Sequence, residues 1–217
     1  MKSKLLILML FIICLSFKLN AQITFNYTDK IFDYKVVVDS VLSGDSVNFD
    51  CVVKSISIFR KANKKIVQTI IVPENYTFFG RLEESKKYVF VLEDVNFDGF
   101  NDFRVIQFEP ANPNIPYYYW TFNYKKQIFQ RDTALEEITS PDIDHKRKVI
   151  TSFWQAGWCD HGVDTYKYIN GKITLIQKYE FACDEKNPEL LISTTRKLIN
   201  GKMKLVQRSV DKIKQEK

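Results

Sequence analysis

Lys167-Tyr-Ile-Asn-Gly-Lys-Ile-Thr-Leu-Ile-Gln-Lys178 recurs 30 residues later as Lys197-Leu-Ile-Asn-Gly-Lys-Met-Lys-Leu-Val-Gln-Arg208. Each copy holds an Asn-Gly pair between two runs that are rich in β-branched and apolar residues. A type I′ turn needs positive φ at both central residues, and Asn followed by Gly tolerates this best. Each copy therefore predicts a tight β-hairpin, and the pair of copies indicates an all-β fold.

Fainter copies of the same pattern surround Asn63-Lys64-Lys65 and Asn123-Tyr124-Lys125. Two interpretations stay open at this point. The copies can be units of a repeat architecture such as propeller blades. Alternatively, lysine-rich hairpin tips exposed to water arise easily by convergence.

Alternating or continuous runs of β-branched and aromatic residues occur along most of the remaining chain. Such runs predict strands. We expect antiparallel sheets built from hairpins, arranged as a β-sandwich or an incomplete propeller. The expected strands are 34–42, 47–59, 66–72, 87–92, 103–108, 117–122, 148–154, 164–169, 172–181, 190–199 and 202–210, with one helical turn within 133–138.

The first residues have the pattern of a signal peptide. Lys2 and Lys4 precede an apolar run from Leu5 to Phe17, and Leu19-Asn20-Ala21 offers a cleavage position before Gln22. The run is shorter than the roughly 20 residues that a spanning helix needs, which disfavours a membrane anchor. Cys14 lacks the small preceding residues of a lipoprotein site. We expect residues 1–21 to be removed and the product to reach the periplasm or cell surface.

Residues 22–217 are expected to form a single domain, because this length suits one well-buried core. The predicted leader contains Lys2, Lys4 and Lys18 and no acidic residue, so its removal lowers the formal net charge from +6 to +3. Much of the basic character therefore belongs to the leader. Nucleic-acid binding loses its main support.

Three cysteines remain after the leader, and an exported chain can oxidise a pair of them. If Asn170 and Gly171 form the turn, the antiparallel register places Cys159 opposite Ala182. A small bulge would bring Cys159 to Cys183, which predicts a disulfide between these two residues. Two buried thiols are the alternative, and Cys51 is expected to take no part in the disulfide.

Asp94-Val-Asn-Phe-Asp-Gly-Phe-Asn-Asp102 is the most specific motif of the chain. Calcium prefers six to eight oxygen ligands, and a short loop supplies several only when it curls around the ion, as Gly99 permits. The motif predicts a Ca²⁺ site. Its expected ligands are the side chains of Asp94, Asn96, Asp98 and Asp102 and the carbonyl of Phe100, with water completing the shell.

The motif is not a complete EF-hand, because Val105 stands where a bidentate Glu is required and the flanking residues predict strands. It resembles instead the calcium loops between strands of integrin-like propeller repeats. The alternative is a turn rich in Asp and Asn without an ion, in which three close carboxylates would repel one another. A bound ion is expected to be structural and to stabilise the adjacent strands.

No set of residues predicts catalysis. His145 and His161 are the only histidines, and neither has the spacing of a metal cluster or a nucleophile with its base. We therefore expect no enzymatic activity and turn to surface recognition. The stretch from Asn112 to Trp120 is aromatic but is expected mainly to fill the core. The stretch from Trp154 to Tyr166 is richer in glycine and polar residues, and a disulfide would hold it rigid.

Several of these motifs together resemble a known family. Gln68-Thr-Ile-Ile-Val72, the Asp94 to Asp102 loop, Tyr117-Tyr-Tyr-Trp120 and the Asn170-Gly171 hairpin resemble exported immunity proteins of a type IV secretion-dependent bacterial killing system. Those proteins are similar in turn to periplasmic inhibitors of invertebrate-type lysozyme. The resemblance runs from about Thr24 to Glu180, and the calcium loop is its specific part.

The resemblance implies an envelope protein that blocks a lysozyme-like peptidoglycan hydrolase by inserting a loop into the glycan cleft. The Ser-Gly-x-x-Tyr signature of lysozyme inhibitors is absent, because Ser43-Gly44 is followed by Asp45-Ser46-Val47. The alternative is a calcium-stabilised module that binds a glycan or an envelope protein without inhibition. The residues expected to contact the partner are Trp158, Asp160, His161, Gly162, Asp164 and Tyr166.

Overall fold

The computed structural model describes residues 21–42, 49–75, 77–79 and 86–212. Most of the predicted signal peptide and the Ser43-Gly44 pair lie outside these residues. Within them, no helix is long and apolar enough to cross a membrane.

The described chain forms three antiparallel sheets, and the all-β prediction is confirmed. Each sheet follows the order of the sequence, except that β5 pairs with β3 in the first sheet. The first sheet holds β1 (Ala21–Thr28), β2 (Phe32–Leu42), β3 (Phe49–Arg60), β4 (Ile66–Ile71) and β5 (Thr77–Phe79). The middle sheet holds β6 (Val91–Glu93), β7 (Asp102–Ile106), β8 (Tyr117–Asn123) and β9 (Ile128–Arg131). The third sheet holds β10 (Pro141–Asp144), β11 (Val149–Gln155), β12 (His161–Ile169), β13 (Lys172–Cys183), β14 (Leu190–Ile199) and β15 (Lys202–Lys212).

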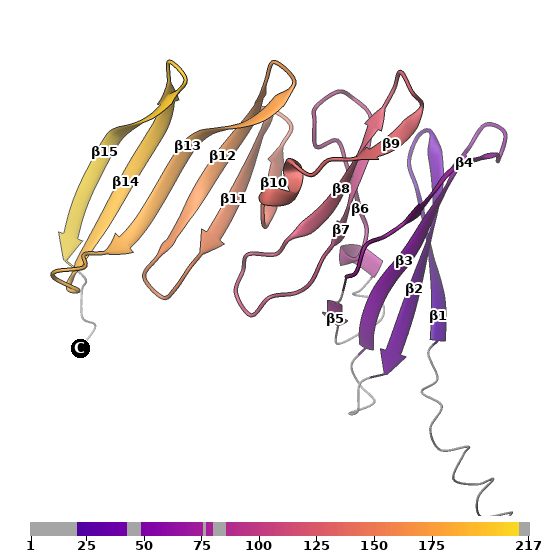
Figure 1. The fold of residues 1–217 in the computed structure, drawn as a ribbon, viewed down its shortest axis with the longest axis horizontal. Helices are drawn as coiled ribbons and strands as arrows, with labels where there is room; N and C mark the ends of the chain where they lie inside the picture. Colours follow the sequence, from indigo (N-terminus) through magenta and orange to yellow (C-terminus); the bar gives the residue numbers. More distant parts are fainter. Residues whose placement is uncertain (1–20, 43–48, 76, 80–85, 213–217) are drawn as a thin grey trace, which may run out of the picture.

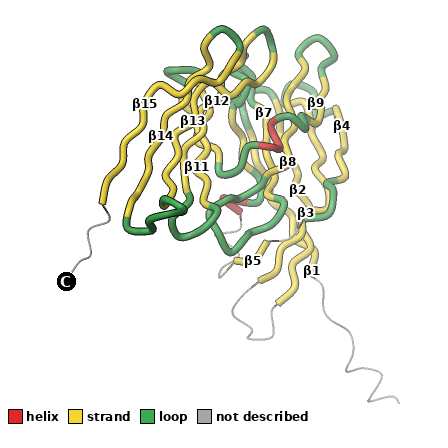
Figure 2. The backbone as a smooth tube through the Cα atoms, turned by 60° about the vertical axis from the view of Figure 1, so that its left-hand side comes forward, coloured by secondary structure: helices red, strands yellow, loops and turns green. Residues whose placement is uncertain are grey.

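The sheets stand side by side in chain order, with the middle sheet between the other two (Figures 1 and 2). Side chains of a strand alternate between its faces, so a sheet covered on both sides contributes to two cores. Phe103 and Trp120 of the middle sheet pack with Tyr34 and Ile56 of the first sheet in the larger core. Tyr119 instead belongs to a second core.

The second core joins the middle sheet to the third. Its fully buried members include Val95, Tyr119, Leu135 and Ile150, where Leu135 comes from a short 3-10 helix, η2 (Leu135–Glu137). This helix confirms the turn predicted within 133–138. Between Asp160 and Lys212, the last residue that the structure describes, only Gly162 is buried, so β13, β14 and β15 extend outward as a sheet that water reaches.

Both Asn-Gly hairpins are confirmed. Asn170 and Gly171 have φ of 50° and 75°, and Asn200 and Gly201 have φ of 52° and 74°. Each hairpin also has a bulge at the same relative position, next to Thr165 in one and next to Thr195 in the other. The 30-residue repeat therefore builds successive hairpins of one sheet rather than separate blades.

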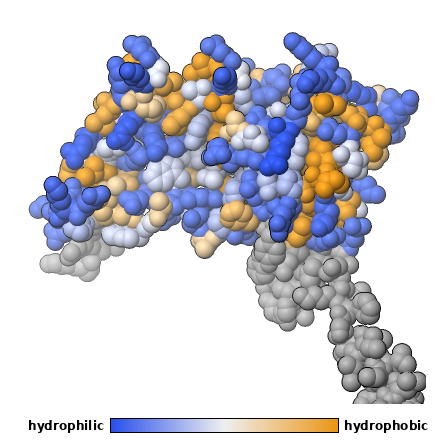
Figure 3. All heavy atoms as spheres, viewed as in Figure 1, coloured by the Kyte–Doolittle hydropathy of each residue, from blue (hydrophilic) through white to orange (hydrophobic). Residues whose placement is uncertain are grey.

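The two fainter copies are also hairpin tips, between β3 and β4 and between β8 and β9. All four tips lie along the upper edge of the molecule in Figure 1. Hydrophilic side chains gather on the tips at this edge (Figure 3). The shared Asn and Lys residues therefore mark one solvated edge.

Some strand predictions were wrong. β1, β5, β9 and β10 were missed, and Lys87 and Tyr88 belong to a helical turn rather than to a strand. β1 starts at the predicted cleavage site. The predicted leader runs directly into it and obscures the alternation of apolar and polar residues along the strand. Phe25 is buried, with Ile23 and Tyr27 packed on the same core, so the period-2 pattern that defines this strand was present.

Candidate functional site

The Asp94 to Asp102 loop connects β6 to β7, so its flanks are extended as predicted. Two residues of the loop have left-handed backbone: Phe97 with φ of 62° and Gly99 with φ of 92°. Gly adopts this conformation freely, whereas a non-Gly residue does so only under constraint. These two positions turn the chain so that the loop curls back on itself.

Side-chain oxygens on the inside of the curl accept hydrogen bonds from the loop backbone. The Asp94 carboxylate accepts from the Asp98 amide at 3.1 Å and from the Gly99 amide at 2.9 Å. The Asn96 side-chain oxygen accepts from Asp98 at 3.0 Å, and the Asp98 carboxylate accepts from Phe100 at 2.9 Å. Three of the predicted ligands therefore share one short stretch of backbone.

Asp102 is the first residue of β7 and is buried. Its carboxylate accepts from the Phe122 amide at 2.8 Å and from the Val95 amide at 3.0 Å. The pKa of Asp102 is raised to about 7, mainly by burial and further by the charges of Asp98 and Asp94, which together outweigh the lowering effect of these two hydrogen bonds. These surroundings thus disfavour the charged form of the Asp102 carboxylate. A nearby cation would favour that charged form.

The loop also connects the two cores. Val95 is buried in the second core, and the Phe97 ring packs edge-on against His145 and Tyr168, with centroids 5.8 and 6.4 Å apart. Phe100 packs on the first core and stacks on Tyr124 at 5.1 Å. The conformation of this loop therefore affects how the middle sheet packs on the third.

The donor set fits a hard cation in its chemistry. Carboxylate and amide oxygens are calcium ligands, and a carboxylate oxygen that accepts one hydrogen bond keeps further acceptor capacity. No salt bridge among the described residues involves Asp94, Asp98 or Asp102. However, no three acidic, His or Cys side chains in the described chain lie together as a metal cluster. Calcium binding thus requires the carboxylates to draw together, and it stays a prediction.

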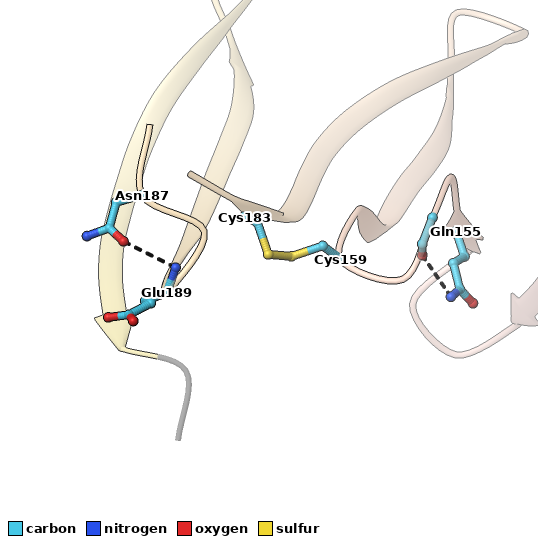
Figure 4. Close-up of a disulfide and its surroundings, with 6 residues drawn as sticks. Gln155, Cys159, Cys183, Asn187 and Glu189 are labelled. Atoms are coloured by element: carbon cyan, nitrogen blue, oxygen red, sulfur yellow. Dashed lines mark hydrogen bonds between the residues drawn. A yellow bond between two sulfur atoms is a disulfide. The ribbon is translucent and has the colours of Figure 1, made fainter. Parts of the chain in front are cut away.

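The Cys159–Cys183 disulfide is present, with 5.7 Å between the Cα atoms (Figure 4). The bulge that the register required lies between Thr165 and Tyr166 and shifts the pairing by one residue. The bond therefore ties loop 156–160 to the end of β13. Cys51 lies buried in β3 and takes no part in the disulfide.

Loop 156–160 is short and braced. The Ala156 amide donates to the Asp160 carbonyl at 2.8 Å, and the Gln155 side-chain amide donates to the Gly157 carbonyl at 2.9 Å. At the tip, Trp158 is 80% exposed. A large aromatic side chain thus projects into water from a loop with little freedom.

The two segments predicted for recognition lie next to each other. Asn114 pairs with the backbone of Gln155 in both directions, each hydrogen bond being 2.8 Å long. Tyr119 and Trp120 are buried, so the core role expected for the end of the first segment is confirmed. The neighbouring loops 107–116 and 156–160 lie at the lower end of the strands, opposite the Asp94 to Asp102 loop (Figure 1).

The predicted extent of the second loop needs correction. β12 begins at His161, three residues before the predicted start, because His161 pairs with both Gln155 of β11 and Phe181 of β13. Side chains after Asp160 therefore alternate between two faces of a sheet. The six predicted contact residues do not form one surface.

His161 is half-buried and stacks on Phe181, with centroids 5.0 Å apart. Gly162 is buried, and Tyr166 packs on the second core. Trp158 and Asp160 are the exposed members of the set.

Asp164 lies on the same face of the third sheet as Gly162. Burial raises the pKa of Asp164, while Lys178 and the Trp154 indole lower it. Asp164 Oδ1 and Trp154 Nε1 are both buried, and neither has a hydrogen-bond partner within normal hydrogen-bond geometry among the described residues.

Lys178, Glu180 and Arg196 form a charged network on this face, which was not predicted from the sequence. Lys178 Nζ lies 2.9 Å from Glu180 Oε1, and Arg196 Nη1 pairs with Glu180 Oε2. Lys178 and Glu180 lie two residues apart on β13, and the register between β13 and β14 adds Arg196, because Lys178 pairs with Arg196 and Glu180 with Thr194.

Among solved structures, the fold is similar to that of a protein from Xanthomonas described as related to a type IV secretion system. The two chains superpose with a TM-score of 0.58 at 18% identity, over 87% of this chain and 98% of the other. This chain shares the fold of that protein.

A protein of unknown function from Bacteroides fragilis aligns with a TM-score of 0.27 at 8% identity, over 88% of this chain and 93% of the other, which is too distant to bear on the fold. No protein-family model and no curated protein matches the sequence. The likeness to the Xanthomonas protein therefore concerns the fold, and the disulfide is compatible with export.

Proposed function

We propose that this protein is an exported, calcium-stabilised binding protein that inhibits, or confers immunity to, a lysozyme-like peptidoglycan hydrolase. It acts by binding and not by catalysis. The observation that carries this proposal is Trp158, which is 80% exposed on a loop that a disulfide ties to the end of β13. Its setting would be the periplasm or the cell surface, and the secretion-related fold neighbour supports that setting.

The physical basis is complementarity to a glycan cleft. Such clefts hold a pair of catalytic carboxylates, and their subsites accept flat rings. In our proposal the Trp158 indole occupies a sugar subsite, while the amides of loop 156–160 donate to the carboxylates. The disulfide and the Ala156 to Asp160 hydrogen bond restrict the free loop, so little conformational entropy is lost on binding.

Calcium has a structural role in this proposal. Asp94, Asn96, Asp98, Asp102 and the Phe100 carbonyl would hold the ion, and the ion would offset the repulsion among the carboxylates. The loop contacts both cores through Val95, Phe97 and Phe100. Calcium would thereby stabilise the stacking of the sheets that display loop 156–160.

Replacement of Trp158 by Ala is expected to weaken hydrolase binding by about 30-fold, because truncating a central aromatic anchor costs about 2 kcal/mol. Binding would be measured by calorimetry against a panel of lysozyme-like hydrolases, and inhibition by the turbidity of cell-wall suspensions. Loss of binding should be accompanied by loss of inhibition.

Ile71→Ala is the matched control, since Ile71 is 75% exposed but lies on β4 of the first sheet. It should bind like the unmodified protein. Equal binding by Trp158→Ala and Ile71→Ala would reject the role of the loop. Tight binding that leaves the rate of lysis unchanged would reject inhibition and favour the envelope-binding module.

A further inference from the structure

A groove of about 470 Å³ lies between the tethered loop and one face of the third sheet. It is not part of the exposed tip that carries Trp158. Trp154 and Asp160 line it from one side, and Glu180, Ile192, Thr194 and Arg196 line it from the sheet. Its volume is within the range of small-ligand sites.

The aromatic side of the groove is fixed by packing. A Cβ atom on Gly162 would lie 2.7 and 2.8 Å from two atoms of the Trp154 indole. The indole therefore lies directly on the backbone of β12, where a larger residue would displace it. The indole lines the groove with the part of its flat, apolar ring that Gly162 and Lys178 leave uncovered, because Lys178 Nζ lies over the ring, 5.4 Å from its centre.

The polar side of the groove is equally well ordered. Glu180 is held by Lys178 and Arg196, and Arg196 Nη1 also lies 3.3 Å from Thr194 Oγ1. Lys178 Nζ is 5.4 Å from the centre of the Trp154 ring. A guanidinium group has five N–H donors, so Arg196 keeps donors for a ligand, and Asp160 adds an exposed acceptor.

This combination favours one class of ligand. The carboxylates of Asp160 and Glu180 disfavour a phosphate or another anion, and the ion pairs disfavour a purely apolar molecule. A sugar ring has weakly polarised C–H groups on its flat faces and hydroxyl groups, both donors and acceptors, around its rim. The C–H groups suit contact with an indole. The hydroxyl groups suit alternating carboxylate, guanidinium and hydroxyl groups of the protein.

We infer that the groove is a carbohydrate subsite, which binds one pyranose ring of a glycan between Trp154 and the Glu180, Thr194 and Arg196 array. The sugar packs on the indole and shares its hydroxyl groups with the array. This site does not depend on the proposed inhibition, because it needs no hydrolase.

The test uses the full chain with chitotetraose and with soluble peptidoglycan fragments as probes, followed by calorimetry and by two-dimensional NMR. Both probes should bind and should shift the indole signal of Trp154. Arg196→Met should raise the dissociation constant at least tenfold, because it removes charge-assisted hydrogen bonds. Thr194→Val should weaken binding less.

Lys197→Met is the control, because Lys197 neighbours Arg196 on β14 but lies on the opposite face and is exposed. It should leave sugar binding unchanged. Melting curves confirm that each variant is folded, and Arg196→Met keeps Glu180 paired with Lys178.

Three results would overturn the inference. The first is the absence of binding by either probe at millimolar concentration. The second is equal weakening by Arg196→Met and Lys197→Met. In the third, Arg196→Met abolishes binding of a hydrolase while neither sugar probe binds, which would identify the groove as a protein contact. Since the sugar assay contains no hydrolase, it fails or succeeds separately from the proposed function.

Discussion

Removal of calcium with a chelator is expected to lower the melting temperature by roughly 8 °C. A ligand present at about a hundred times its dissociation constant adds about 2.7 kcal/mol to the free energy of unfolding. In a chain of this size, about 1 kcal/mol shifts the melting temperature by about 3 °C. The effect is global because the Asp94 to Asp102 loop packs on both cores through Phe97 and Phe100.

Asp98→Asn tests whether this loop binds the ion. An Asn oxygen can still accept the hydrogen bond from the Phe100 amide, which is 2.9 Å long, so the curl should persist. The substitution removes one of the three carboxylate charges that are proposed to bind calcium. We expect most of the calcium-dependent shift to disappear, and the melting temperature in chelator to stay equal or rise, since repulsion with Asp102 falls.

Asp142→Asn is the control, because Asp142 is an exposed carboxylate on β10 outside the loop. It should keep the full calcium response, as followed by differential scanning calorimetry. Identical melting curves of the unmodified protein with calcium and with chelator would reject the site. Equal responses of Asp98→Asn and Asp142→Asn would show that the ion binds elsewhere.

Local signals explain why the hairpins and the disulfide could be predicted. Asn170-Gly171 fixes the turn type by itself, and the turn then sets the register for ten residues on either side. Only a one-residue bulge had to be assumed to bring Cys159 to Cys183, and the structure has that bulge. The extended flanks of the Asp94 to Asp102 loop followed likewise from the runs of β-branched and aromatic residues on either side of it.

The remaining features depend on contacts between distant residues. The start of β12 at His161 is determined by its pairing with Gln155 on one side and Phe181 on the other. The place of Arg196 in the network with Lys178 and Glu180 depends on the register of β13 and β14, which pairs Lys178 with a residue 18 positions away. Neither pairing leaves a trace in the local sequence.

Gly162 shows most clearly how a residue can be selected for the wrong reason. The sequence suggested a partner contact in a loop held rigid by the disulfide, whereas Gly162 is buried in β12. A Cβ atom there would lie 2.3 Å from the Tyr179 carbonyl oxygen and within 2.8 Å of the Trp154 indole. The neighbour in closest contact is backbone, which cannot move without disturbing the pairing of β12 with β13.

Gly162→Ala is therefore expected to destabilise the protein by about 3 kcal/mol, the upper part of the usual range for overpacking. This corresponds to a fall in melting temperature of roughly 9 °C. The substitution should also displace the indole, which near-ultraviolet circular dichroism and tryptophan fluorescence would detect.

Gly157→Ala is the matched comparison. Gly157 lies five residues earlier in loop 156–160, and a Cβ atom there would have no neighbour within 4 Å. Replacing it should change the melting temperature little, or raise it slightly by restricting the unfolded chain. If both alanine variants melted like the unmodified protein, β12 would not pack against Trp154 and Tyr179 as described. In that case the ordered indole on which the carbohydrate subsite depends would be lost as well.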